Sequence, residues 1–261
     1  MSRLHVDYDR VAPGYDRRHA DGGLKGPAHA LQALARDVGA GRVLEVGCGT
    51  GHWLQVLHTT LPAPAGPFYG LDLSTGMLTQ ARARGAPLHL VRGRAGGLPF
   101  GTSSFDLVYC VNAIHHFDAP GAFVAEARRL LRPGGALAVI GTDPRRIGDR
   151  WYVYDYFDGT YETDLARFPS WGTIVDWMAA AGFEPVDWRV VERIVDAKVG
   201  RAVLDDPFLR KDATSQLTLL SDEAYAAGLR RVEEAVAAAE ASGRQATFGV
   251  DLLLGMVTGR A

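Results

Sequence analysis

Three glycines at alternate positions, Gly47, Gly49 and Gly51, follow the apolar run 43–46 and precede a helix-like stretch over 52–57. A short apolar run of this kind is typical of a buried parallel strand. Glycines between a strand and a helix let bare backbone approach a ligand, and the free N–H groups of the helix N-terminus attract negative charge. The segment therefore predicts a binding loop for a ligand that carries an anionic group.

The spacing of the glycines and the acid before them narrow the choice of ligand. Dinucleotide sites favour Gly-x-Gly-x-x-Gly, whereas here His52 occupies the position of the third glycine. Glu45, two residues before the first glycine, would repel a pyrophosphate. A zwitterionic amino-acid group fits better, because the helix terminus can hold its carboxylate while Glu45 attracts its ammonium.

Five segments in a fixed order carry a resemblance to a known family. They are 45–51, 70–78, 93–100, 105–117 and 130–139. Together they resemble the class I S-adenosylmethionine-dependent methyltransferases, near the ubiquinone/menaquinone-methylase or type 11 branch. The resemblance implies S-adenosyl-L-methionine as the cofactor, with S-adenosyl-L-homocysteine as its product. It also implies an α/β fold, a doubly wound, mostly parallel seven-stranded sheet with helices on both faces and helical lid insertions.

The same resemblance implies which residues bind the cofactor. Asp72 lies 72 − 51 = 21 residues beyond Gly51, close to the spacing of about 20 expected for an acid that binds ribose hydroxyls. The family often has an adenine-binding acid after the third strand, but here Arg94 stands there and cannot accept a hydrogen bond. We therefore expect backbone groups or a stacked arginine at the adenine. The full set is Tyr15, Glu45, Gly47, Cys48, Gly49, Gly51, Asp72, Leu73, Met77, Gly93, Arg94, Ala95 and Asn112.

His115 and His116 follow the fourth expected strand, at the edge of the sheet where ligands of open α/β sheets bind. Methyl transfer from a sulfonium requires alignment, exclusion of water and, for some acceptors, removal of a proton. Histidine has a suitable pKa for the last task. Both are therefore candidate bases, with His116 favoured over His115. The alternative is that both histidines only pack in the loop. No metal site is predicted, because adjacent histidines rarely chelate one ion.

The stretch 151–161 is rich in aromatic residues and offers the best clue to the acceptor. Tyrosine occupies every second position at Tyr152, Tyr154 and Tyr156. These side chains could form one face of a strand, or they could line a pocket for a flat or hydrophobic substrate. Because the stretch lies in an insertion after the fifth strand, these tyrosines are the candidate substrate contacts.

Helices and strands alternate up to residue 142, as in one parallel α/β domain over 1–261. Residues 1–26 resemble the N-terminal cap of the family, and 144–169 and 196–246 are expected to be lid or substrate insertions. Further expected helices cover 28–38, 123–131, 173–181 and 222–241, and two antiparallel strands cover 186–195 and 248–257.

Composition limits the partners. The 261 residues are 47% hydrophobic and 22% charged with a net charge near −2, so the basic surface of a nucleic-acid binder is not expected. The first residues lack the apolar core of a signal peptide, and no apolar run approaches the ~18 residues of a membrane helix. Two cysteines without framework spacing indicate a cytoplasmic protein. Whether it forms a homodimer is left open.

The sequence therefore predicts an enzyme that methylates a small molecule, for example in specialised metabolism. One alternative is the same fold using the cofactor without methyl transfer, as a cyclase would. A macromolecule methyltransferase is disfavoured by the lack of a basic surface. A nicotinamide-dependent oxidoreductase is disfavoured by Glu45 and the glycine spacing.

Overall fold

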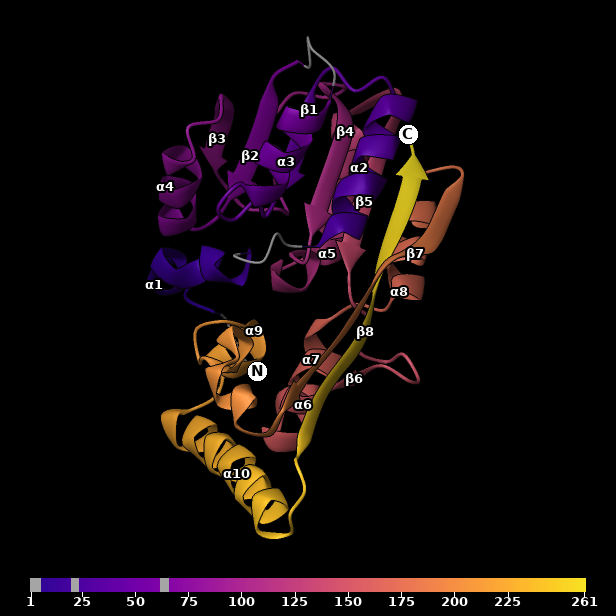
Figure 1. The fold of residues 1–261 in the computed structure, drawn as a ribbon. Helices are drawn as coiled ribbons and strands as arrows, with labels where there is room; N and C mark the ends of the chain where they lie inside the picture. Colours follow the sequence, from indigo (N-terminus) through magenta and orange to yellow (C-terminus); the bar gives the residue numbers. More distant parts are fainter. Residues whose placement is uncertain (1–5, 20–23, 62–65) are drawn as a thin grey trace.

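The computed structural model describes residues 6–19, 24–61 and 66–261. Within these residues one eight-stranded sheet has the order β3-β2-β1-β4-β5-β8-β6, and β7 pairs with β8 (Figure 1). Strands β3, β2, β1, β4 and β5 are parallel, whereas β8 is antiparallel to β5, β6 and β7. The strands are β1 Val43–Val46, β2 Phe68–Asp72, β3 Leu88–Arg92, β4 Phe105–Val111, β5 Leu131–Gly141, β6 Arg150–Trp151, β7 Val186–Val199 and β8 Thr247–Arg260.

Helices cover both faces of this sheet. One hydrophobic cluster joins the sheet to α5 and α8, and a second joins the opposite face to α2 and α3. The α-helices are α1 Tyr8–Val11, α2 Lys25–Asp37, α3 His52–Thr60, α4 Thr75–Ala83, α5 Pro120–Leu130, α6 Tyr152–Tyr156, α7 Thr160–Arg167, α8 Trp171–Ala180, α9 Ser215–Thr218 and α10 Asp222–Ala241. The 3-10 helices are η1 Ala12–His19, η2 Ile114–His116, η3 Gly200–Asp205 and η4 Pro207–Leu209. The doubly wound α/β fold is thus confirmed.

Local signals account for several element boundaries. All four residues of β1 are buried, as expected of a strand covered on both faces. Helix α10 spans Asp222–Ala241 as the sequence predicts. The Ser221 side chain accepts the Ala224 N–H at its start, and Gly243 with a φ of 68° follows its end.

The expected count of seven strands differs from the structure by the two-residue strand β6. Both β7 and β8 also run longer than predicted, to 14 residues each. They leave the main sheet as a two-stranded ribbon, which Figure 1 shows descending beside α6 and α7. This extension gives the inserted segments a surface on which to pack.

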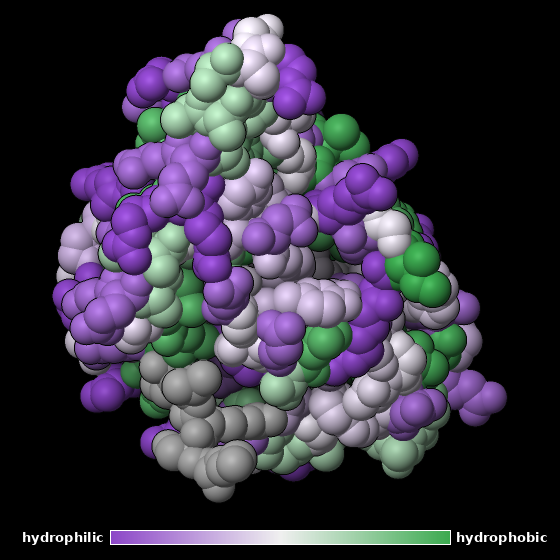
Figure 2. All heavy atoms as spheres, turned by 90° about the horizontal axis from the view of Figure 1, so that it is seen from below, coloured by the Kyte–Doolittle hydropathy of each residue, from purple (hydrophilic) through white to green (hydrophobic). Residues whose placement is uncertain are grey.

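The two expected insertions form a lobe with its own core below the sheet (Figure 1). This core contains Tyr152 of α6, Phe157 directly after α6, Val232 of α10 and Phe248 of β8. On the face seen from below, hydrophobic residues occur in small groups among hydrophilic ones (Figure 2). We call this assembly of α6, α7, η3, η4, α9 and α10 the lower lobe.

Candidate active site

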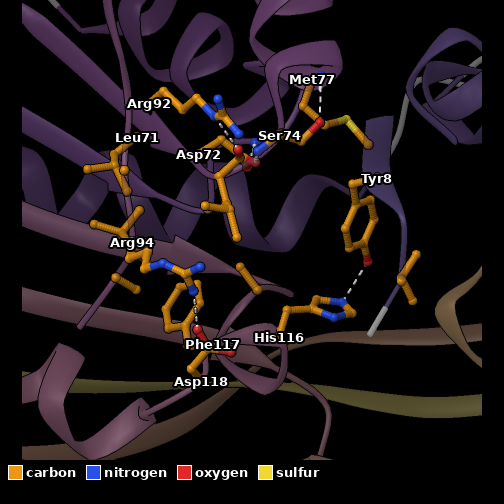
Figure 3. Close-up of a pocket in the computed structure, with 18 of the residues that line it drawn as sticks. Tyr8, Leu71, Asp72, Ser74, Met77, Arg92, Arg94, His116, Phe117 and Asp118 are labelled. Atoms are coloured by element: carbon orange, nitrogen blue, oxygen red, sulfur yellow. Dashed lines mark hydrogen bonds and ion pairs between the residues drawn. The ribbon is translucent and has the colours of Figure 1, made fainter. Parts of the chain in front are cut away.

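A cavity of about 750 Å³ lies at the carboxyl ends of the parallel strands (Figure 3). Its walls come from the N-terminal segment, the loops after β1 and β2, the end of β3, and the loop after β4. Of the predicted cofactor residues, those that line it are Tyr15, Gly47, Gly49, Asp72, Leu73, Met77, Gly93, Arg94, Ala95 and Asn112. Residues 1–5 and 20–23 of the expected cap lie outside the described residues.

The glycine loop is pinned to the neighbouring strand. The backbone N–H groups of Gly47 and Cys48 both donate to the Leu71 carbonyl, at 2.7 and 3.1 Å. Gly49 has a φ of 52°, and a Cβ placed there would point at the Tyr15 ring, 4.0 Å away across the cavity wall. A side chain at Gly49 would therefore be strained and would occupy ligand space.

Asp72 organises the loops on either side of itself. One carboxylate oxygen accepts the Gly49 N–H at 2.8 Å, and the other accepts the Ser74 N–H at 2.9 Å. Burial raises the pKa of Asp72, although these backbone hydrogen bonds oppose the shift. The acid thus links the glycine loop to the start of α4 while still lining the cavity.

Two carboxylates fasten the N-terminal segment over the cavity. Asp9 accepts the Ser74 hydroxyl at 2.6 Å and the Gly76 N–H at 2.7 Å, and the Ser74 hydrogen bond lowers the pKa of Asp9. Asp16 accepts the Thr50 hydroxyl at 2.5 Å and pairs with Arg84 at 2.5 Å. The segment therefore packs against the loops that follow β1 and β2.

The two histidines occupy different environments. The Tyr8 hydroxyl lies 2.7 Å from Nε2 of His116, and both residues line the cavity (Figure 3). The His115 ring instead stacks on Phe168, with centroids 3.7 Å apart, outside that cavity. Burial lowers the pKa of His115 well below its usual value, so this ring is neutral. Of the two candidates, only His116 reaches the cavity.

Asn112 sits where β4 ends, with an unusual backbone conformation. Its φ of 49° is in the left-handed region, which asparagine tolerates better than most residues. Its N–H donates to the Ile140 carbonyl at 2.8 Å. This conformation turns the chain from the strand into the loop that carries His116.

Glu45, Cys48 and Gly51 are not among the residues that line the described cavity, and their cofactor roles stay predictions. Glu45 is 1% exposed and accepts the Tyr109 hydroxyl at 3.3 Å. Burial raises the pKa of Glu45 well above its usual value. Its predicted attraction for an ammonium group stays a prediction.

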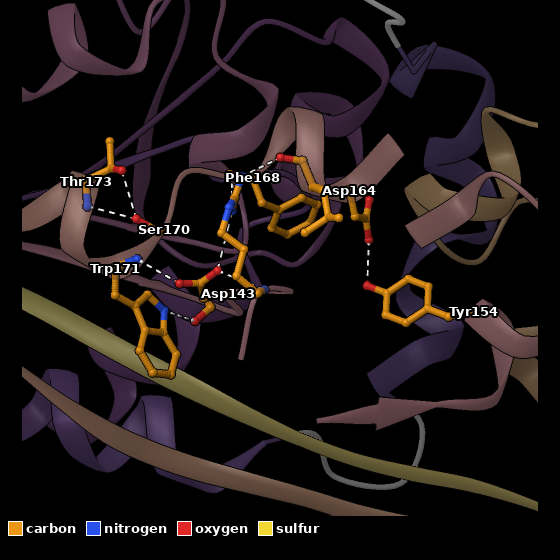
Figure 4. Close-up of polar contacts among 10 residues, drawn as sticks. Asp143, Tyr154, Asp164, Phe168, Ser170, Trp171 and Thr173 are labelled. Carbon is orange, nitrogen blue, oxygen red and sulfur yellow. Dashed lines mark hydrogen bonds and ion pairs between the residues drawn. The ribbon is translucent and has the colours of Figure 1, made fainter. Parts of the chain in front are cut away.

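The three candidate substrate tyrosines lie on helix α6, not on a strand, and none lines the described cavity. The Tyr152 hydroxyl donates to Asp206 at 2.9 Å, and the Tyr154 hydroxyl donates to Asp164 at 2.8 Å (Figure 4). The Tyr156 ring packs against Phe248 with centroids 5.2 Å apart. Their acceptor role stays a prediction, and their observed contacts are within the lower lobe.

Sequence reasoning missed several residues of the cavity wall. They include Asp9, Ser74, Arg92, Phe117 and Asp118. Ser74 could have been found as the N-cap of α4, whose Met77 N–H it accepts at 3.0 Å. Asp118 lies two residues after His116, and its pairing with Arg94 is a contact between segments that are distant in sequence. Among the described residues no group of three or more His, Cys, Asp or Glu is arranged to hold a metal. No helix in that part of the chain is long and apolar enough to cross a membrane.

Comparison with known proteins agrees with this geometry. A family described as "Methyltransferase domain" matches residues 44–139. Demethylmenaquinone methyltransferase of Geobacillus kaustophilus is 31% identical over 169 residues, 59% of this chain and 70% of that protein. Phthiotriol/phenolphthiotriol dimycocerosates methyltransferase of Mycobacterium tuberculosis is 38% identical over 135 residues, 51% of this chain and 46% of that one. The chain thus spans about half the length of the mycobacterial relative.

A solved structure shares the fold across most of the chain. It is that of a putative methyltransferase from an antibiotic biosynthesis pathway of Anabaena variabilis, with a TM-score of 0.66 and 19% identity. The similarity covers 92% of this chain and 98% of that one. From the glycine loop, the cavity and these relatives we conclude that the chain belongs to the class I S-adenosylmethionine-dependent methyltransferases.

Proposed function

We propose that this protein transfers a methyl group from S-adenosyl-L-methionine to a small-molecule acceptor. The observation that carries the proposal is the contact between Tyr8 and Nε2 of His116 in the wall of the cavity. It provides a polar, proton-accepting group beside a space that is otherwise suited to the cofactor. The small-molecule relatives support the choice of acceptor class.

The residues of the cavity fit the cofactor. Gly49 lines the cavity in a left-handed conformation that a residue with a side chain would adopt only with strain. Asp72 would accept the ribose hydroxyls in addition to its two backbone partners, and Asn112 would line the methionine side. When bound, the cofactor supplies an electrophilic methyl group on sulfur. The protein's task is then to align the acceptor with that methyl group and exclude water.

His116 would accept the proton from an acceptor that must lose one. The hydrogen bond between the Tyr8 hydroxyl and Nε2 of His116 holds the imidazole toward the cavity, and the neutral His115 ring lies against it, with centroids 3.9 Å apart. An already ionised acceptor would need the pair only for orientation. The Tyr8–His116 contact therefore has a role in either case.

The lower lobe would provide the acceptor side of the site. It carries the expected insertions 144–169 and 196–246, and η4 contacts the η1 part of the N-terminal segment. Tyr152, Tyr154 and Tyr156 would act by shaping this lobe, or by direct contact after it moves toward the cofactor. In the described arrangement their partners are Asp206, Asp164 and Phe248.

The central experiment follows the methyl group. The protein is incubated with methyl-labelled S-adenosylmethionine and a panel of phenols, amines and carboxylic acids, and label is traced by mass spectrometry. We expect label in one class of small product together with S-adenosylhomocysteine. A product formed without label would favour the cyclase-like alternative. Label confined to RNA or protein, bound in a salt-dependent way, would favour a macromolecule methyltransferase.

Variants of the histidine pair test its role. His116→Ala should lower the turnover number by about 100-fold for a proton-bearing acceptor, while cofactor affinity changes by less than tenfold. Tyr8→Phe should have a smaller effect in the same direction. His89→Ala is the control, because the exposed His89 stacks on Tyr69 away from the cavity. Equal loss in the control, or unfolding of both cavity variants, would contradict the proposed role.

Single alanine variants of Tyr152, Tyr154 and Tyr156 test the acceptor side. Cofactor affinity should stay within about tenfold, whereas at least one variant should lose about 1–3 kcal/mol of transition-state stabilisation. Normal turnover in all three would assign these residues to the core of the lower lobe alone.

The two buried free cysteines, Cys48 and Cys110, fit a protein of the reducing cytoplasm.

A further inference from the structure

The adenine of the cofactor presents a donor for which the expected partner is missing. Its exocyclic amino group donates hydrogen bonds, and a buried donor without an acceptor is costly. At the end of β3 the chain presents Arg92, Gly93, Arg94 and Ala95, whose side chains offer no acceptor. A side-chain acceptor for this amino group would therefore come from another part of the cavity wall.

The described cavity wall carries four carboxylates, and three of them already accept hydrogen bonds from backbone N–H groups of the chain. Asp7 accepts two N–H groups at the start of α1. Asp9 accepts the Ser74 hydroxyl and a backbone N–H of α4. Asp72 accepts backbone N–H groups on both of its oxygens. None of these three lies against the end of β3 in the way that Asp118 does.

Asp118 reaches the end of β3 from the loop after β4. Its carboxylate pairs with Arg94 at 2.6 Å, and the side chains of Asp118 and Arg94 are 64% and 68% exposed. An ion pair so exposed adds little to the stability of the fold, so a stabilising role does not explain why Asp118 and Arg94 pair. In Figure 3 Arg94, Phe117 and Asp118 lie together on one side of the cavity, while Tyr8 and His116 lie on the other. The pair thus lies away from the side proposed for the acceptor.

We infer that Asp118 recognises the exocyclic amino group of the cofactor's adenine, with Arg94 as a positioning residue that holds its carboxylate. The base would lie between apolar parts of the wall, Leu73 and Phe117, with its amino edge toward Asp118. When the base covers the ion pair, water leaves the pair. The lower local dielectric then strengthens both the ion pair and the hydrogen bond from the amino group to Asp118. A purine with an oxygen in place of the amino group would set that oxygen against the carboxylate.

The test is a comparison of two ligands by calorimetry, S-adenosylhomocysteine and its deaminated analogue S-inosylhomocysteine. The wild-type protein should bind the adenosyl ligand at least about tenfold more tightly, the scale of a hydrogen bond to a charged group. In Asp118→Asn this preference should fall toward equality, because the amide can donate to the oxygen of the inosyl base. Asp37→Asn is the matched control, since Asp37 is 65% exposed and pairs with Arg260 outside the cavity.

A second variant separates positioning from stacking. If Arg94 holds the carboxylate, Arg94→Gln should reduce the preference for the adenosyl ligand. If the arginine instead stacks on the base, both ligands should weaken together and the preference should stay, which would overturn its positioning role. An unchanged preference in folded Asp118→Asn, or equal binding of both ligands by the wild type, would overturn the inference. None of these measurements depends on the acceptor or on methyl transfer.

Discussion

Removing the carboxylate of Asp72 should weaken cofactor binding by about 2–4 kcal/mol, or about 30- to 1000-fold in the dissociation constant. Each ribose hydroxyl that donates to an ionised acceptor contributes about 1.5–3 kcal/mol, and water entering the half-buried position recovers part of the sum. Asp72 also accepts the Gly49 and Ser74 N–H groups. Asp72→Ala should therefore loosen the glycine loop as well as remove the ribose partner.

Calorimetry with S-adenosylhomocysteine measures this loss, and Asp106→Ala is its matched control. Asp106 also accepts two backbone N–H groups, from Gly41 at 2.9 Å and Arg42 at 2.7 Å, but it does not line the cavity. Both variants should lower the melting temperature, because each leaves two backbone donors without their acceptor. Only Asp72→Ala should lose affinity. Unchanged affinity in folded Asp72→Ala, or an equal loss in Asp106→Ala, would refute the reasoning.

Three further outcomes follow from the same geometry. Gly49→Val should abolish binding of S-adenosylhomocysteine while the circular dichroism spectrum stays folded, and normal binding would show that the loop is not the cofactor cradle. Because burial raises the pKa of Glu45, the folded chain keeps a proton that the unfolded chain releases above the usual value of 4.5, and stability falls as pH rises through the raised pKa. Glu45→Gln should therefore raise the melting temperature more at about pH 8 than at about pH 5, and an equal change at both would count against a neutral Glu45. Tyr152→Phe should cost about 1–3 kcal/mol of stability in urea unfolding, since it removes a hydrogen bond from the buried Asp206, with cofactor affinity unchanged.

Predictions that depend on local patterns agree closely with the structure. The apolar run of β1, the glycines after it and the helix that follows are neighbours in sequence, so their geometry follows from backbone sterics and hydrogen bonding. The limits of α10 follow from the Ser221 cap and Gly243 in the same way. Asp72 at the cavity wall follows from strand–helix–strand spacing.

The surroundings of several side chains depend on contacts between distant segments, which patterns in the sequence do not predict. The alternate tyrosines of 152–156 have the period of a strand, but they form a helix because its apolar residues pack against α10 and β8. Glu45 lies next to the glycine loop in sequence, but its buried position and its hydrogen bond from Tyr109, 64 residues away, depend on how the strands pack.

The doubly wound sheet, the glycine loop, Asp72 and the two histidines at the carboxyl edge could be predicted from the sequence, because each depends on residues that lie close together in the chain. Which of these side chains face the cavity depends on the packing of elements that are distant in sequence. Tyr8 contacts His116, 108 residues away, and Arg94, just after β3, contacts Asp118 in the loop after β4. Such pairings depend on how whole elements pack, and the alternation of polar and apolar residues along one segment carries no information about its distant partner.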